Sequence, residues 1–297
     1  MRCLLKGLGL VIGCGTLLWS CEGTPSSTSA PAVGAPGNGD GGPGVECSRD
    51  EECGNTEAPS CCQSRCADTT RDIANCGACG IACASKDFCA PTGCLPARIA
   101  NVCKLGRATA LLDGAPADNQ AAADVLTALA ANCAPAPATR SIDQATADVI
   151  DPADGRVVVR GGELLVLAGG PYFNKTSGFL EKQRTVPVYN GGIPPTIQFI
   201  RSADDAVISS STFPESTPSH DMIVIQIGRE HETGTLALVA YGFHPNGTRA
   251  AVWQFVHAMA PNLASYPDAY YVYDWSDTNG DQIPNEGDTW KLLGSGS

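Results

Sequence analysis

The sequence predicts an α/β protein: a layered domain with a mixed sheet and flanking helices, preceded by a small disulfide-rich module and a disordered linker. Three observations support this prediction. Strand-like and helix-like segments alternate from Ala97 onward, ten cysteines lie between Cys47 and Cys94, and residues 22–46 are rich in Gly, Pro, Ser, Thr and Ala. The predicted divisions are a leader at 1–20, a linker at 21–46, a cysteine module at 47–96 and an α/β domain at 97–297.

The first twenty-one residues have the layout of an export signal. Arg2 and Lys6 give a positive start, and residues 8–19 form an apolar run that is too short for a permanent transmembrane helix. The run ends at Leu18-Trp19-Ser20-Cys21, which resembles the bacterial lipobox, in which the cysteine becomes the lipidated first residue. This resemblance implies a membrane anchor on Cys21. The alternative is an ordinary signal peptide in which Cys21 is incidental.

The composition disfavours some classes of partner. The chain has 19 basic and 31 acidic residues, and its net charge is -12. Such a charge disfavours nucleic acid and electrostatic attraction to anionic membrane surfaces, and it suits an extracellular body that holds cations. Residues 22–46 have too little apolar surface to offset the entropy of ordering them, so we expect a flexible tether.

The cysteine count also indicates export. Three of the 15 cysteines belong to the leader and anchor, and an even number remains. A segment with few aliphatic side chains needs cross-links, so we expect disulfides, although the spacing leaves their pairing open. The alternatives are a redox pair at Cys76 and Cys79, or a zinc site from these two with Cys83; both need free thiols.

Two runs in the module have a specific spacing. They are Cys61-Cys62-Gln-Ser-Arg-Cys66-Ala-Asp68 and, after Asp72, Asn75-Cys76-Gly77-Ala-Cys79-Gly80-Ile-Ala-Cys83. In these runs the module resembles the stigma-specific cysteine-rich family of secreted plant proteins, and similar modules recur in exported proteins of myxobacteria. The resemblance covers about a sixth of the chain. It implies an extracellular, disulfide-rich interaction module without catalysis.

The first unit of the α/β domain is a predicted strand and helix. The strand is expected at Ala108–Leu112 and the helix at Asn119–Ala131, with Asp118 as its N-cap. A helix that folds back along the preceding strand ends near the start of that strand. Cys103 and Cys133 bracket the unit, so they are candidates for a disulfide.

The rest of the domain is predicted from apolar periodicity and β-branched content. Residues 134–156 are expected to be mostly connecting. Further helices are predicted near Ser141–Val149, around Asn174–Lys182 and at Asn246–Met259. The predicted strands are Val157–Val159, Glu163–Ala168, Val186–Tyr189, Thr196–Ile200, Ala206–Ser209, Tyr270–Trp275, Thr289–Leu293 and the two of a hairpin, Met222–Ile227 and Thr235–Tyr241.

An acidic segment near the end of the sequence has the spacing of a calcium loop. It places oxygen-bearing side chains at positions 1, 3 and 5, a backbone carbonyl at 7 and a carboxylate at 12. The candidate ligands of calcium are Asp277, Asn279, Asp281, the carbonyl of Ile283, and Asp288. Gln282 departs from the motif, which has glycine there, and Asp288 replaces the usual glutamate. The alternative is an acidic hairpin turn built from Asx residues.

No nucleophile, base and orienting group can be recognised together in the sequence. Gly169-Gly170 lacks the further residues of a phosphate-binding loop, His231-Glu232 lacks the second histidine of zinc proteases, and Ser209–Ser211 lack a Gly-x-Ser-x-Gly frame. We therefore expect no catalytic residues.

The α/β region also carries a resemblance. Its segments 119–129, 164–174, 236–253 with Gly247-Thr248-Arg249, and 271–281 are similar, in this order, to surface-layer-type domains of archaeal cell-envelope proteins. The resemblance spans about two-thirds of the chain and implies an envelope domain with a structural or binding role. A single copy on a tethered lipoprotein departs from the relatives that form arrays.

Taken together, we expect a protein that is exported and anchored by lipid to the cell envelope, in the outer membrane or at the cell surface. Its expected role is binding or scaffolding, stabilised by calcium, with an envelope polysaccharide or a surface protein as partner and no nucleic acid. One alternative is a hydrolase of envelope polymers, which two carboxylates facing each other across a deep apolar cleft would favour. Another is that the cysteine module alone binds the partner.

Overall fold

The computed structural model describes residues 45–54, 59–112, 115–143, 146–193, 195–212 and 216–297. The predicted leader, the lipidation candidate Cys21 and the linker as far as residue 44 lie outside the described residues. In the part that is described, no helix is long and apolar enough to cross a membrane.

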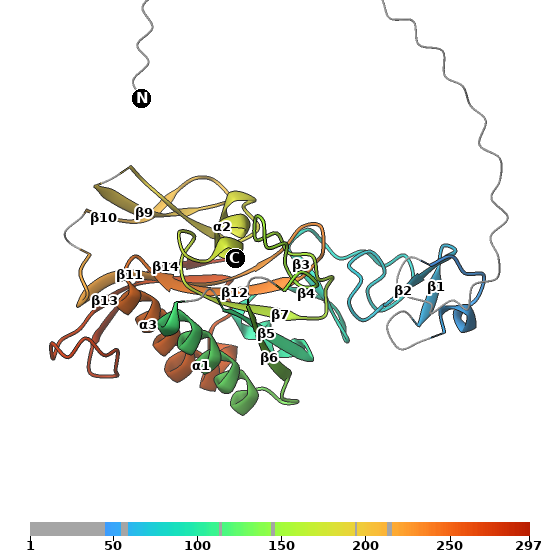
Figure 1. Ribbon diagram of the computed structural model, residues 1–297, viewed down its shortest axis with the longest axis horizontal. Helices are drawn as coiled ribbons and strands as arrows, with labels where there is room; N and C mark the ends of the chain where they lie inside the picture. Colours follow the sequence, from blue (N-terminus) through green and yellow to red (C-terminus); the bar gives the residue numbers. More distant parts are fainter. Residues whose placement is uncertain (1–44, 55–58, 113–114, 144–145, 194, 213–215) are drawn as a thin grey trace, which may run out of the picture. The chain divides into compact units, whose positions relative to one another are not determined.

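A mixed seven-stranded sheet forms the centre of the α/β region, which confirms the predicted fold class (Figure 1). Its order is β14-β13-β11-β12-β7-β5-β6, and β6, β5, β7 and β12 run parallel to one another, whereas β11, β13 and β14 pair antiparallel. The strands are β5 (Arg107–Leu112), β6 (Ala138–Asp143), β7 (Leu164–Ala168), β11 (His220–Arg229), β12 (Leu236–Gly242), β13 (Tyr270–Ser276) and β14 (Thr289–Gly296).

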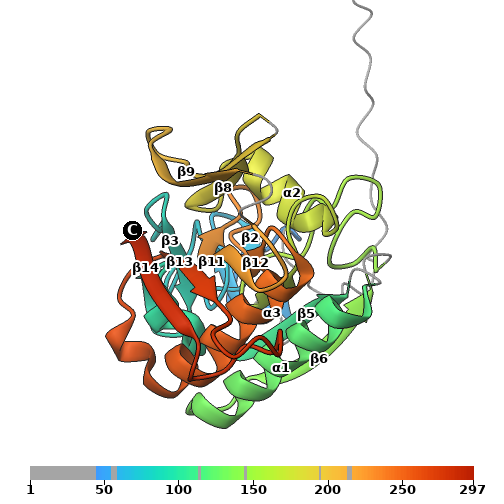
Figure 2. The same cartoon turned by 90° about the vertical axis from the view of Figure 1, so that its left-hand side faces the viewer.

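Both faces of the sheet are covered, as Figures 1 and 2 show. The helices α1 (Pro116–Asn132) and α3 (Pro245–Gln254) pack on one face, and α2 (Lys175–Lys182) packs on the other. Because side chains alternate along a strand, Leu164 and Val166 of β7 enter the first core and Leu165 enters the second. Burial on both faces explains why β7 is apolar throughout.

A separate antiparallel sheet lies beside α2. It has the order β10-β9-β8, from β8 (Val188–Gly191), β9 (Thr196–Arg201) and β10 (Val207–Thr212). Val188 and Phe199 are fully buried in the core that this sheet shares with the central one. The sequence predicted these strands within two or three residues, but not that they form a sheet of their own.

Three sequence predictions are wrong in detail. Helix α1 begins at Pro116 with Ala115 as its N-cap, because proline suits the first turn; Asp118 lies inside that turn, near the positive end of the helix dipole. The helix predicted near Ser141–Val149 is replaced by β6, an edge strand whose side chains are mostly exposed and therefore show no apolar alternation. Val157–Val159 form only an isolated bridge, from Val157 to Ile150.

The other helices and the hairpin agree with the sequence. The predicted helix at Asn246–Met259 is α3 followed by one π-helical turn, Phe255–Met259, and the chain continues as a 3-10 segment, Ala260–Ser265. Asn174 caps α2 by accepting hydrogen bonds from the N–H groups of Thr176 and Ser177. Strands β11 and β12 form the predicted hairpin, with β11 extending to Arg229.

The cysteine region is held by disulfides, as predicted. Its hairpins are β1 (Ser60–Cys62) with β2 (Arg65–Ala67) and β3 (Asp87–Ala90) with β4 (Gly93–Pro96), and short 3-10 turns span Asp50–Cys53 and Ile99–Lys104. The disulfides are Cys47–Cys61, Cys53–Cys66, Cys62–Cys79, Cys76–Cys89, Cys83–Cys94 and Cys103–Cys133. Cys76 and Cys79 therefore bond to different partners and form no redox pair with each other. The last bridge joins the two cysteines that bracket the first strand and helix.

The β3–β4 hairpin belongs to the same core as the α/β region. Phe88 and Ala90 of β3 are almost completely buried among residues of α1 and the 3-10 turn, which include Val102 and Val125. The predicted boundary after residue 96 thus runs between segments that share one core. At the other end, Glu46 of the predicted linker forms a bridge with Arg65.

Candidate functional site

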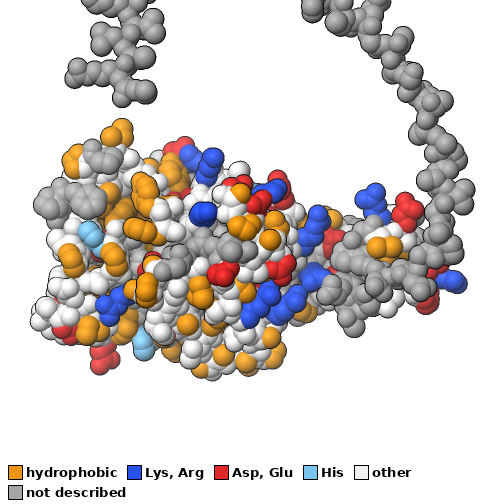
Figure 3. All heavy atoms as spheres, viewed as in Figure 1, with side chains coloured by type: hydrophobic (Ala, Val, Ile, Leu, Met, Phe, Trp, Pro, Cys, Tyr) orange, Lys and Arg blue, Asp and Glu red, His pale blue; other side chains and the backbone are white. Residues whose placement is uncertain are grey.

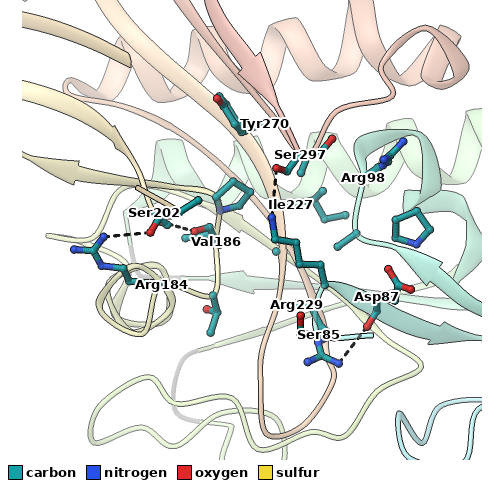
Figure 4. Close-up of a pocket in the computed structure, with 18 of the residues that line it drawn as sticks. Ser85, Asp87, Arg98, Arg184, Val186, Ser202, Ile227, Arg229, Tyr270 and Ser297 are labelled. Carbon is teal, nitrogen blue, oxygen red and sulfur yellow. Dashed lines mark hydrogen bonds between the residues drawn. The ribbon is translucent and has the colours of Figure 1, made fainter. Parts of the chain in front are cut away.

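A cavity of about 360 Å³ lies where three parts of the described structure meet (Figure 4). One wall comes from the β3–β4 hairpin, at 85–87 and 96–98. A second comes from the segments 184–187 and 201–203, which flank the small sheet. The third comes from the ends of β11 and β13, together with Ser297. The volume is within the usual range for small-molecule sites.

The cavity is lined by an excess of basic side chains. Asp87 is the one acidic side chain among its lining residues, whereas the chain as a whole is acidic. Acidic and basic side chains are mixed on the face seen in Figure 3, so the excess is a local feature. The basic residues of the cavity are Lys86, Arg98, Arg184, Arg201, Arg229 and His231.

Two of these arginines are already neutralised by neighbouring acids. Arg201 forms a bidentate pair with Asp204, with N–O distances of 2.8 and 2.6 Å. Arg184 pairs with Asp205 and also lies over the ring of Tyr189, 4.4 Å from its centroid. In Figure 4 the Arg184 side chain turns toward Ser202 and away from Arg229. These two pairs close the rim of the cavity, and they offer little charge to a ligand.

Arg229 differs, because it is buried without an acidic partner. The residue is 8% exposed, and its Nη1 donates to the backbone oxygen of Asp87 at 3.2 Å. Its Nε is buried and has no hydrogen-bond partner within the described chain. Burial lowers the pKa of Arg229. Burying an unpaired guanidinium costs several kcal/mol, on the order of 3–5 kcal/mol in proteins, so the fold holds this group at a substantial cost.

Two further cations complete the arrangement. Arg98 also has a buried Nε without a partner among the described residues. Lys86 donates from Nζ to the main-chain oxygen of Ser297, the last residue of the sequence, at 3.5 Å. The cavity thus offers two cations, Arg98 and Arg229, whose hydrogen-bonding capacity is largely unused.

The floor of the cavity is apolar and depends on one glycine. The lining there includes Pro187 and the almost completely buried Val186 and Ile227, and Gly228 packs against Val186. A Cβ on Gly228 would lie 2.3 Å from the backbone oxygen of Thr185, so only glycine allows the two segments to approach this closely. Unused donors above an apolar floor are typical of a binding site for an anion.

The acidic loop between β13 and β14 folds as a series of Asx turns. Asp277 accepts from the N–H groups of Gly280 at 2.8 Å and Gln282 at 2.6 Å, and Asp281 accepts from that of Ile283 at 2.7 Å. Gln282 takes the left-handed conformation, φ 60°, that the calcium motif assigns to glycine.

The twelfth position of the loop faces the core. Asp288 is 8% exposed and accepts from the indole Nε1 of Trp275 at 3.0 Å. Among the described residues, only two groups of three side chains bring metal-ligating atoms within 4.8 Å of one another. Both groups consist of disulfide-bonded cysteines. The carboxylates of Asp277, Asp281 and Asp288 are therefore not gathered, although Asn279 bonds to Asp281. Calcium binding stays a prediction.

Calcium is expected to raise the melting temperature of the protein if the loop closes around it, because an ion that binds only the folded state stabilises it. The check is a thermal melt with millimolar calcium and with magnesium, on the natural chain and on Asp281→Asn. A calcium shift that survives in Asp281→Asn would place the ion elsewhere.

The acids that are most buried do not form the facing pair that would favour a hydrolase. Glu163 binds Arg140 at 3.0 Å, Glu181 binds the hydroxyl of Tyr241, and Asp221 accepts from Ser216 Oγ at 2.7 Å. The cavity described above has a single acidic side chain among its lining residues, and so has a second cavity, between α1 and α3, which contains Asp124.

These buried acids predict a pH dependence of stability. Burial raises the pKa of Glu181 to about 7 and that of Asp221 to about 6, from ordinary values of 4.5 and 3.8. The folded protein therefore keeps protons that the unfolded chain releases, so the free energy of unfolding falls as the pH rises from about 4 to about 7. Glu181→Gln should remove about 3 kcal/mol of this fall. Urea unfolding between pH 4.5 and 8 measures the free energy of unfolding, with the exposed Glu232→Gln as the control. If the free energy of unfolding of Glu181→Gln falls with pH as steeply as that of the natural chain, the pH dependence does not come from Glu181.

The sequence alone does not reveal the cationic cavity. Its unused cations stand singly at positions 98 and 229, with no local motif. The one usable clue was Arg229, a charged residue at the end of a long apolar strand. No known family model matches the chain, and comparison with curated proteins and with solved structures gave no match either.

Proposed function

We propose that this chain is an exported binding protein that holds an anionic group of its ligand in the cavity at Arg229. The observation that carries the proposal is the buried guanidinium of Arg229, which has a single backbone partner. An unpaired buried charge destabilises a fold, whereas a ligand that supplies the missing acceptors recovers that energy on binding.

The setting of this function follows from the sequence. A leader that ends in Cys21 supports attachment to the cell envelope by lipid, and the disulfide framework supports an oxidising compartment. An envelope polysaccharide or a surface protein with acidic groups is the partner that this setting favours. Because the β3–β4 hairpin and the α/β region both line the cavity, binding would use both parts of the chain rather than the cysteine module alone.

Titration of the mature, oxidised protein with small anions tests the proposal. Sulfate, phosphate and acetate are added separately, and binding is followed by calorimetry and by the melting temperature. At least one anion should bind saturably, and Arg229→Gln should abolish the binding. Arg49→Gln, which changes an exposed arginine paired with Glu52, is the control and should bind normally. Equal binding by Arg229→Gln and the natural chain would refute the proposal.

Removal of an acid at the rim is expected to strengthen anion binding. Asp204→Asn breaks the bidentate pair with Arg201 and returns a free guanidinium to the cavity. The affinity for a small anion should rise by about threefold to tenfold, with a steeper dependence on salt. Asp151→Asn, which frees the surface residue Arg156 instead, is the matched control and should leave the affinity unchanged. A loss of affinity in Asp204→Asn would contradict this prediction.

A further inference from the structure

We propose that the anionic group is a carboxylate carried on a small, partly apolar organic body, and that it docks side-on against the Nε and Nη2 groups of Arg229. The inference rests on the proposed function, because it specifies the ligand of the same cavity.

The unused edge of the Arg229 guanidinium has the geometry for a carboxylate. Nη1 is engaged by the backbone oxygen of Asp87, and this bond fixes the plane of the group. Nε is buried without a partner, and the described chain provides no hydrogen bond for Nη2 either. The N–H groups of Nε and Nη2 point in parallel, so they match the two oxygens of one planar carboxylate. Figure 4 shows the Arg229 guanidinium held next to Asp87.

The charge available in the cavity favours an anion of single charge. Arg184 and Arg201 are committed to Asp205 and Asp204, and the carboxylate of Asp87 offsets one of the two unpaired cations, Arg98 and Arg229. A dianion such as phosphate would lose more hydration energy on entering than a carboxylate would, and the apolar floor returns none of it. A monoanion requires only the pair of parallel donors, Nε and Nη2, on the unused edge of Arg229.

The rest of the cavity suits the body of the ligand. Pro96, Ala97 and Pro187 present apolar surface, and the volume of about 360 Å³ admits a single ring with its substituent. Arg98 also lines the cavity, and its Nε has no partner among the described residues. The carboxylate could belong to a free organic acid or to an acidic sugar unit of a polymer, because both have the same head group and a body of one ring.

Three probes with the same ring distinguish the head groups. Cyclohexanecarboxylate, cyclohexylphosphonate and cyclohexylmethanol are titrated into the mature, oxidised protein by calorimetry. The carboxylate should bind at least about tenfold more tightly than the phosphonate, and the alcohol should not bind detectably. Glucuronate and a glucuronate-containing trisaccharide then separate the two sources: tighter binding of the trisaccharide identifies a polymer unit, and equal or weaker binding identifies a free acid.

Two variants test whether the parallel donors Nε and Nη2 of Arg229 hold the carboxylate. Arg229→Lys keeps the charge but has no pair of parallel donors, so the affinity for cyclohexanecarboxylate should fall by at least about tenfold. Arg49→Lys, at an exposed arginine that is paired with Glu52 outside the cavity, should bind normally. Unchanged affinity in Arg229→Lys, or phosphonate binding as tight as that of the carboxylate, would overturn the inference and leave anion binding intact. If no anion binds at all, the proposed function fails as well. The titrations of the three probes into the natural chain test the preference for a carboxylate even if Arg229→Lys does not fold.

Discussion

Gly247→Ala is expected to lower the free energy of unfolding by about 4 kcal/mol. Gly247 lies in the first turn of α3, against the carboxylate of Asp221, which is fully buried. A Cβ at this position would lie 1.9 Å from Asp221 Oδ2. The same oxygen accepts the N–H of His244 at 2.7 Å and so ties the start of α3 to β11. Alanine is the better helix former by about 1 kcal/mol, but the overlap with a fixed carboxylate outweighs that gain.

Chemical denaturation of Gly247→Ala measures this loss. Gly106→Ala is the matched control, because a Cβ there meets no atom within 4 Å, and its effect should stay within about 0.5 kcal/mol. Asp221→Ala removes the obstructing oxygens, so the double variant should lose less than the sum of the two single variants. Additive losses, or a Gly247→Ala protein as stable as the natural chain, would show that the helix start shifts without cost.

The parts of the fold that the sequence predicts are those with a strong local pattern. Strand β7 is apolar over its whole length, β11 contains the apolar run 222–225, and Asn174 provides a capping side chain at the start of α2. Strand β6 has no such pattern: it lies at the edge of the sheet, and pairing with β5 rather than burial holds it there. Its formation depends on a contact with a strand about thirty residues earlier, which a local window does not contain.

The candidate site was hidden for the same reason. Lys86 and Arg98 flank the β3–β4 hairpin and Arg229 ends β11, and what distinguishes Arg229 is that it is buried without an ion pair in the described chain. The acidic loop shows the opposite case. Its residues are close in sequence, so the pattern was visible, and the Asx turns at Asp277 and Asp281 are local. The orientation of Asp288, however, depends on Trp275, which belongs to the packing of the sheet.

Removal of the Cys76–Cys89 disulfide is expected to abolish anion binding and to destabilise the cysteine region by about 3 kcal/mol. The bridge closes a loop of sequence separation 13 and fixes Cys89 in β3, next to the core residue Phe88. Strand β3 begins at Asp87, whose backbone oxygen holds Arg229, so release of this strand also frees the guanidinium. The core on the other face of the sheet contains no residue of β3 or β4, so the sheet should stay folded.

The Cys47–Cys61 disulfide provides the matched control, because it closes a loop of nearly the same length, sequence separation 14, and contributes no residue to the cavity. In the chain-entropy description the two double-serine variants lose similar stability, of about 3 kcal/mol each. Only the Cys76→Ser, Cys89→Ser variant should lose anion binding. Hydrogen exchange should then show β3 and β4 unprotected while β11 and β12 remain protected. If both variants kept anion binding, the β3 wall would not position Arg229; if both lost it, general stability rather than the placement of β3 would control the site.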